Sequence, residues 1–198
     1  EGLFHGAIAQ SGLAGTTTLQ RAEHYRDDPE PGAGMSSREL VLEWLQGAGR
    51  ASSRDEARAL QESLSPVELA AFLRGLSLPQ LFAPLQVPGG MYRAPQHFRD
   101  GYVLPEDSLL TVFADPERWN RVPLITGTNR DEMKLFLALN PEYVTRWFGL
   151  IPRVKDPDSY NWLSAYLSDR WKALAVDEVA ETISASGVEE PVYAYRFD

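Results

Sequence analysis

Two adjacent acids, Asp131 and Glu132, follow a tract that predicts a strand, a loop and a helix start. The tract Val122-Pro-Leu-Ile-Thr-Gly-Thr-Asn-Arg-Asp-Glu predicts a buried strand over Val122–Thr126 and a glycine-permitted loop after it. In open α/β sheets, reacting groups collect beyond the carboxyl ends of the strands. A carboxylate held there can orient and charge-stabilise a histidine. An acid pair at a helix start also favours the helix dipole, and by that rule alone this simpler role is the commoner one.

Three further stretches accompany the acid tract. The chain opens with Gly2-Leu-Phe-His-Gly-Ala-Ile-Ala-Gln-Ser11-Gly12, continues with Arg99-Asp-Gly-Tyr-Val-Leu-Pro105, and closes with Pro191-Val-Tyr-Ala-Tyr-Arg-Phe-Asp198. In this order, the four stretches resemble the type-B carboxylesterases, the cholinesterase-like branch of the α/β-hydrolases. The resemblance runs from end to end, and its Gln-Ser-Gly, Asp-Gly-x-x-Leu-Pro and Gly-Thr-Asn-Arg-Asp-Glu motifs are specific in combination.

The resemblance implies that Glu132 is the acid of a serine–acid–histidine triad. In that family the serine elbow lies before the strand that ends in Gln-Ser-Gly, and the histidine follows the Tyr-Arg-Phe-Asp strand. We therefore expect a partial serine carboxylesterase that lacks the nucleophile elbow and the catalytic histidine segment and is inactive alone. The intact enzyme would hydrolyse small-molecule carboxylic esters through an acyl-enzyme, without a cofactor.

Ser11 is a second candidate site residue. It stands in Gln-Ser-Gly rather than in a nucleophile elbow, and in the resembling family the matching serine hydrogen-bonds the triad acid. A strand-end serine that caps local backbone is an equally good interpretation. Met133 replaces the glycine that usually follows the acid in the family. His5, His24 and His97 lack the family's catalytic context and show no metal spacing, so we predict no metal site.

Aromatic side chains suggest an ester pocket, because such pockets are largely apolar. The pocket candidates are Phe136, Trp147 and Phe148. Aromatic residues at helical spacing more often belong to a core.

Composition excludes several classes of partner. A net charge of −9 argues against nucleic acid and against anionic membrane surfaces. There is no cysteine, which excludes disulfides and slightly favours a cytoplasmic location over secretion from a bacterium. No apolar run approaches the length of a membrane span.

The order of predicted elements favours an α/β fold with a few parallel strands and a helical cap. Strands are predicted over Leu3–Gln10, Val122–Thr126 and Val192–Phe197. Residues 16–90 read as a helical cap or insertion, and residues 141–188 as a helical segment before the last strand. The cap helices have serine starts with an acid three positions on: Ser36 and Glu39, Ser53 and Glu56, Ser65 and Glu68. We expect one partial α/β-hydrolase domain, the C-terminal-middle part of that fold, over residues 1–198.

Two other functions remain open from the sequence. Cholinesterase-like adhesion proteins keep the fold and lose the nucleophile, so the chain could come from a non-catalytic binding protein. It could also be a stand-alone domain of another role. Because a parallel sheet is normally covered and paired, the strands are expected to recruit the rest of the esterase or copies of the chain itself.

Overall fold

The computed structural model describes residues 2–87 and 91–198 of the 198-residue chain. These residues form two compact units, each described here by itself. One unit comprises the chain up to Thr16 together with Gly101–Asp198, and the other comprises Thr17–Asp100.

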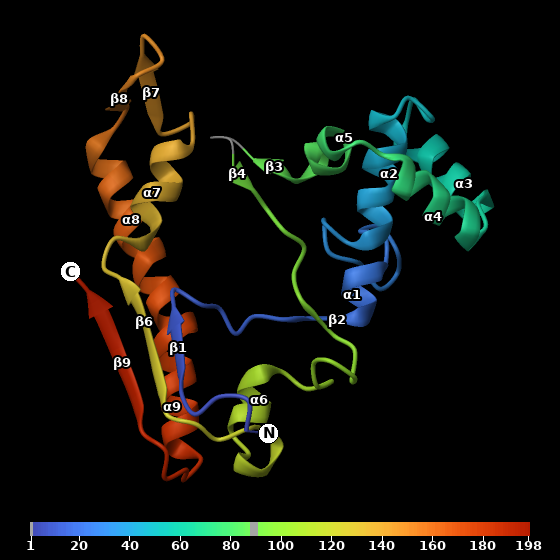
Figure 1. The fold of residues 1–198 in the computed structure, drawn as a ribbon. Helices are drawn as coiled ribbons and strands as arrows, with labels where there is room; N and C mark the ends of the chain where they lie inside the picture. Colours follow the sequence, from blue (N-terminus) through green and yellow to red (C-terminus); the bar gives the residue numbers. More distant parts are fainter. Residues whose placement is uncertain (1, 88–90) are drawn as a thin grey trace. The chain divides into compact units, whose positions relative to one another are not determined.

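The first unit is built on a parallel sheet of three strands (Figure 1). Strand β6 (Leu124–Asn129) lies between β1 (Ala7–Gln10) and β9 (Val192–Phe197), and both pair with it in parallel. All three carboxyl ends therefore lie at one edge of the sheet. This mixture of helices with a parallel sheet agrees with the predicted α/β class, while the assignment to the α/β-hydrolases stays a prediction.

One face of the sheet is covered by helices. Helix α8 (Pro157–Lys172) continues through a π-helical turn (Ala173–Asp177) into α9 (Glu178–Ala185), and this long helical stretch runs along the strands in Figure 1. On the other face, Ile8, Ile125 and Tyr193 lie side by side in the register and are exposed.

At their amino ends, strands β1 and β6 are shorter than the predicted strands. Strand β1 begins at Ala7 rather than Leu3, and β6 begins after Pro123, which has no N–H to give to a ladder. Strand β6 also runs past Thr126 to Asn129, because β9 pairs with it as far as Phe197. The last strand has the predicted bounds.

The predicted helical segment from residue 141 contains an antiparallel hairpin instead at its start. Strands β7 (Val144–Trp147) and β8 (Ile151–Val154) pair with each other, and helix begins only at Pro157. The hairpin strands are rich in β-branched and aromatic residues, which favour an extended backbone. Asp156 then caps α8, accepting hydrogen bonds from the N–H groups of residues 158 and 159.

The remaining helices of this unit are short. They are α6 (Leu109–Phe113), a 3₁₀ turn (Pro116–Arg118) and α7 (Glu132–Leu139). A small core joins α7, the hairpin and α8 through Leu137, Val144 and Tyr160.

The second unit is mainly helical. Its helices are α1 (Leu19–Glu23), α2 (Ser37–Gly47), α3 (Arg54–Ser63), α4 (Pro66–Gly75), α5 (Leu78–Phe82) and a 3₁₀ turn (Ala83–Leu85). Its two-residue strands are β2 (Thr17–Thr18), β3 (Gln86–Val87), β4 (Met91–Tyr92) and β5 (Phe98–Arg99). The core consists of Tyr25, Val41, Leu42, Leu45 and Ala57.

The three predicted serine caps are present at α2, α3 and α4. In each, the serine hydroxyl accepts the N–H of the acid three positions on. Only Ser65 and Glu68 complete the reciprocal box, because Glu39 and Glu56 bond to other backbone N–H groups. Residues 88–90, at the end of the segment predicted as a helical cap or insertion, lie outside the described residues, and the cap role of this unit stays a prediction.

Within residues 2–87 and 91–198, no helix combines the length and the apolar character needed to cross a membrane.

Candidate functional site

Glu132 lies at the carboxyl edge of the parallel sheet. It is the first residue of α7, three positions after the end of β6, and Ser11 directly follows the end of β1 at the same edge. Because β1 and β6 are parallel neighbours, two residues 121 positions apart in the chain meet there.

One carboxylate oxygen of Glu132 collects all of its recorded hydrogen bonds. Oε2 accepts from the hydroxyls of Ser11 at 2.7 Å and Thr128 at 2.8 Å. It also accepts from the backbone N–H of Asn129 at 2.9 Å and from the Asn129 side-chain amide at 3.0 Å. Within the described ranges, Oε1 receives no hydrogen bond. The carboxylate is therefore fixed through one oxygen and open at the other.

Ser11 makes its bond from an uncommon backbone conformation. Its φ is +52°, in the left-handed region that few residues other than glycine adopt. Its N–H nevertheless donates to Gly127 O at 2.7 Å, which extends the β1–β6 ladder by one step. Backbone outliers of this kind cluster at functional sites, so this one supports a role for Ser11 beyond ending a strand.

These contacts keep Glu132 ionised. Partial burial alone would raise the pKa of the carboxyl group, but the hydrogen bonds from Asn129, Ser11 and Thr128 favour the charged form and outweigh it. The pKa of Glu132 consequently lies below its ordinary value, and near neutral pH the group is an anion.

Asp131 is engaged differently. Its carboxylate pairs with Lys134 at 3.1 Å and with Arg130 at 3.2 Å. The hydrogen bond from Lys134, followed by that from Arg130, lowers the pKa of Asp131. Both oxygens of Asp131 are therefore used in ion pairs at the start of α7. This is the structural role that the sequence predicts for an acid at a helix start.

Helix α7 is held in place by α8. The N–H of Met133 donates to Ser168 Oγ at 3.0 Å, and the Tyr160 hydroxyl donates to Lys134 O at 2.7 Å. Ser168 and Tyr160 are both buried. Contacts with buried residues of α8 therefore hold the first turn of α7 in place, and Glu132 with it.

Among residues 2–87 and 91–198, no hydrogen bond or ion pair joins a histidine to Glu132. A ring nitrogen of His24 lies 3.0 Å from Glu30 O, and the carbonyl of His97 accepts the N–H of Thr17. No group of three metal-binding side chains occurs among the residues that the structure describes.

The aromatic pocket candidates are spread over two elements. Phe136 lies four positions after Glu132 on α7 and stacks on Trp171 of α8, with ring centroids 6.1 Å apart. Trp147 and Phe148 lie at the exposed end of the β7–β8 hairpin.

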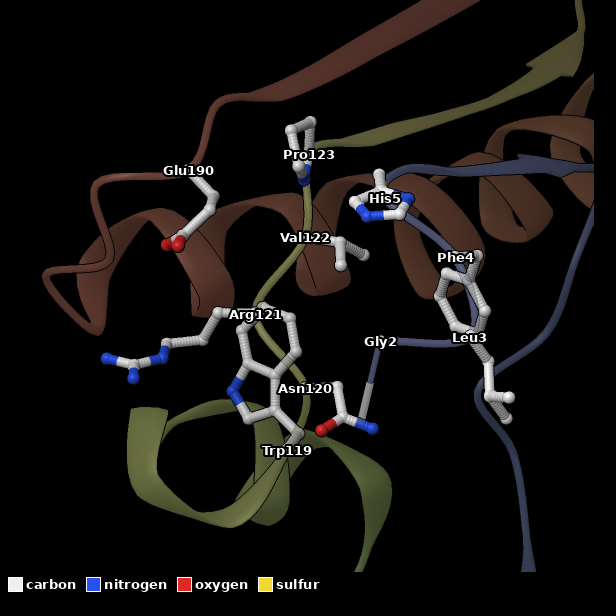
Figure 2. A pocket seen from close by; sticks show the side chains of 10 residues that line it. All are labelled: Gly2, Leu3, Phe4, His5, Trp119, Asn120, Arg121, Val122, Pro123 and Glu190. Carbon is white, nitrogen blue, oxygen red and sulfur yellow. The ribbon is translucent and has the colours of Figure 1, made fainter.

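A cavity of about 530 Å³ lies at the opposite edge of the sheet (Figure 2). Its lining residues immediately precede the three strands, among them His5, Trp119, Arg121 and Glu190. Because ligands of open α/β sheets bind at the carboxyl ends, this cavity is not where the fold would place a reaction. A second cavity, of about 760 Å³, belongs to the helical unit and is lined mostly by apolar side chains such as Leu40, Val41 and Trp44.

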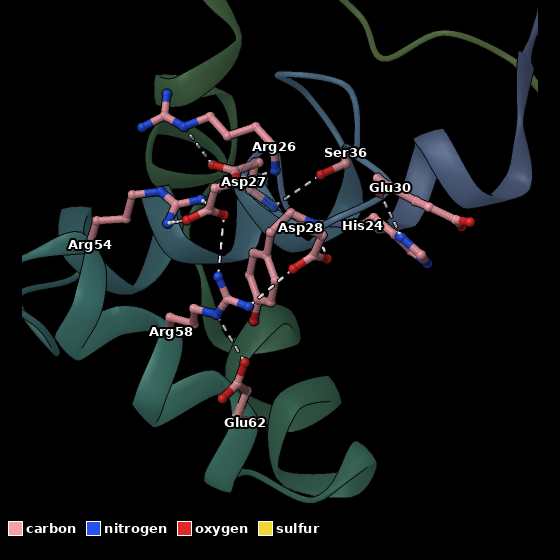
Figure 3. Close-up of polar contacts among 11 residues, drawn as sticks. His24, Arg26, Asp27, Asp28, Glu30, Ser36, Arg54, Arg58 and Glu62 are labelled. Carbon is pink, nitrogen blue, oxygen red and sulfur yellow. Dashed lines mark hydrogen bonds and ion pairs between the residues drawn. The ribbon is translucent and has the colours of Figure 1, made fainter.

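The helical unit also contains a cluster of charges around the buried Tyr25 (Figure 3). Arg54 donates to both oxygens of Asp27, at 2.9 and 3.1 Å, and Arg58 pairs with Asp27, Asp28 and Glu62. The Arg58 guanidinium lies 4.1 Å from the centre of the Tyr25 ring. These pairs join the loop after α1 to α3, and we assign the cluster a structural role.

Thr128, Asn129 and Ser168 complete the setting of Glu132, and the sequence alone did not single them out. Thr128 and Asn129 precede the acid by four and three positions, so their spacing is a signal that could have been used. Ser168 lies 35 positions from Met133, and no local pattern indicates it.

No family model and no curated protein matches the chain.

Proposed function

We propose that Glu132 is the acid of a serine–histidine–acid triad in a carboxylic ester hydrolase. The observation that carries the proposal is the asymmetric setting of its carboxylate. Four hydrogen bonds hold Oε2 at the carboxyl edge of the sheet, and Oε1 is left to accept the Nδ1–H of an imidazole.

In this mechanism the anion works through the histidine. The serine hydroxyl attacks the ester carbonyl while the imidazole takes its proton, and the alcohol leaves with that proton to give an acyl-enzyme. Water then releases the acid by the same route. Glu132 holds the imidazole in the useful tautomer and stabilises the imidazolium that forms in each half. The proposal assigns no residue of the 198 to the serine or the histidine of the triad.

A structural role competes with this proposal. A glutamate in the first turn of a helix often reaches back to a backbone N–H three positions earlier, as Glu132 does to Asn129. That role requires a hydrogen-bond acceptor, whereas the triad also requires a negative charge. Replacing the acid by its amide therefore separates the two.

The test is Glu132→Gln in the intact protein, with Asp131→Asn as the matched control. We expect Glu132→Gln to fold and to lower kcat on a p-nitrophenyl ester by roughly 10³ to 10⁴, the scale on which a triad acid contributes. Asp131→Asn, which removes a charge one position away, should stay within a few-fold of wild type. If Glu132→Gln also stays within a few-fold of the wild-type kcat, Glu132 is not part of the triad. An inactive wild type would favour the non-catalytic relatives instead.

The chain of residues 1–198 by itself should hydrolyse no ester, since the proposal gives it one triad member. A saturable, stoichiometric burst of p-nitrophenol from the purified chain would contradict this and point to a nucleophile among its own serines.

A further inference from the structure

The end of the β7–β8 hairpin is a continuous exposed apolar tip. The exposed fractions are 55% for Trp147, 93% for Phe148, 80% for Leu150 and 60% for Ile151. Single exposed apolar residues are ordinary, but a contiguous group of large ones marks an interaction site. We call these four residues the hairpin tip.

The turn itself carries a residue that turn chemistry disfavours. Phe148 and Gly149 both have positive φ, +50° and +72°, and the N–H of Leu150 donates to Trp147 O at 3.0 Å. Hairpin turns with two positive φ values favour Asn-Gly or Gly-Gly. A phenylalanine there is strained, and its exposure means that packing with the described residues offsets little of that strain. Strain kept without internal compensation points to a use for the side chain outside the chain.

Positive charge lies beside this tip. The hairpin, residues 144 to 154, carries Arg146 and Arg153 and no acid, while Lys155 at its base is flanked by Glu142 and Asp156. Neither arginine forms an ion pair with the described residues. The Arg153 guanidinium lies 5.4 Å from the centre of the Trp147 ring, and Arg146 pairs in the ladder with Pro152, one step below the tip.

We propose that the hairpin tip inserts into a phospholipid surface. Tryptophan and large apolar side chains favour the boundary between headgroups and acyl chains. Arg146 and Arg153, one and two steps back along the ladder, suit phosphate oxygens. A lipid surface suits the tip better than a protein groove, because its exposed apolar residues lie beside charges that are all of one sign. The hairpin carries two positive charges, so the net charge of −9 for the whole chain places −11 on the rest of it. Salt screens charges beyond about 10 Å, so the hairpin's own cations dominate at the contact. The inference does not rest on ester hydrolysis.

The test is sedimentation of the 198-residue chain with phosphatidylcholine vesicles, with and without phosphatidylglycerol. We expect the wild type to bind, and more strongly when the anionic lipid is present. Phe148→Asn should weaken binding roughly tenfold, the scale of exposing one large apolar side chain. Because asparagine tolerates positive φ, the same variant should keep or raise the unfolding temperature, so lost binding cannot be ascribed to lost folding. Arg146→Gln with Arg153→Gln should abolish the preference for the anionic lipid.

A matched control removes equally exposed apolar side chains elsewhere. Val67→Ser with Leu78→Ser changes residues of α4 and α5 that are 78% and 70% exposed and should bind as the wild type does. The proposal is overturned if Phe148→Asn binds like the wild type, or if the control loses as much. It is also overturned if the wild type binds no vesicles. If Phe148→Asn then dissociates an oligomer in ultracentrifugation, the tip is a protein contact instead.

Discussion

At the scale of single residues, Glu132 and Asp131 are neighbours in sequence with different chemistry. Asp131 is neutralised by Arg130 and Lys134, whereas the donors to Glu132 in the described part of the chain are all uncharged, so its charge is kept for another group. An anion held by neutral dipoles is suited to stabilising a cation that forms during a reaction. This difference, rather than the presence of an acid pair, is the physical ground for choosing Glu132.

The depressed pKa of Glu132 predicts a pH dependence of stability. A carboxyl whose pKa is lower in the folded state stabilises the fold above its unfolded pKa, about 4.5, and loses that contribution as pH falls through the folded value. The wild type should therefore exceed Glu132→Gln in unfolding free energy near neutral pH, and the gap should shrink below about pH 4.5. Urea titrations of both proteins across this range measure the gap.

Ser11→Ala supplies the corresponding control. It removes one donor to Oε2 but leaves the carboxyl in place. The difference in unfolding free energy between Ser11→Ala and Glu132→Gln should therefore be smaller than that between wild type and Glu132→Gln, and it should vanish over the same pH range. A gap that is independent of pH would show that the hydrogen bonds do not favour the ionised form.

At the scale of elements, close contact between β6 and β9 depends on Gly127. A methyl group at this position would collide with the Tyr195 ring, its partner in the register. We predict that Gly127→Ala lowers the unfolding free energy by about 1–3 kcal/mol, the range for overpacking. Gly47→Ala, at the end of α2 with open space around it, should be neutral or stabilising by up to about 1 kcal/mol. Equal effects in urea denaturation would mean that Tyr195 moves aside without cost.

Local signals explain which elements could be predicted. The serine starts of α2, α3 and α4 and the β-branched and aromatic last strand are encoded within a few residues, and their positions were predicted closely. The β7–β8 hairpin was not, because residues 141–188 were predicted to be a helical segment throughout. Its pairing joins Val144 to Val154 across a turn that has no standard turn residue at Phe148.

The residues of the candidate site could likewise be predicted only where a local motif contains them. Glu132 and Ser11 stand in motifs that resemble a known family, so the sequence brought each forward separately. Their contact is made by parallel pairing of strands that are more than a hundred residues apart in the chain, which no local pattern encodes. The same holds for Ser168, which reaches α7 only because α8 packs on it.

At the scale of the whole molecule, the first unit has an uncovered sheet face and two outer strands. Ile8, Ile125, Tyr193 and Phe197 are exposed on that face, although parallel sheets are normally covered on both sides. We predict that the chain associates, with copies of itself when alone, and that Tyr193→Lys shifts it toward the monomer. Light scattering over a range of concentrations measures both. A compact wild-type monomer that binds no hydrophobic dye and unfolds in one cooperative step would contradict the prediction.

The central claim is that Oε1 of Glu132 accepts a hydrogen bond from the Nδ1–H of a histidine, and proton NMR of the intact protein tests it most directly. An imidazole Nδ1–H held by a carboxylate resonates far downfield of ordinary amide protons. We predict such a resonance in the wild type and in Asp131→Asn, and its loss in Glu132→Gln. A downfield imidazole proton that is unchanged in Glu132→Gln, or its absence from a wild type that hydrolyses esters, would contradict the account.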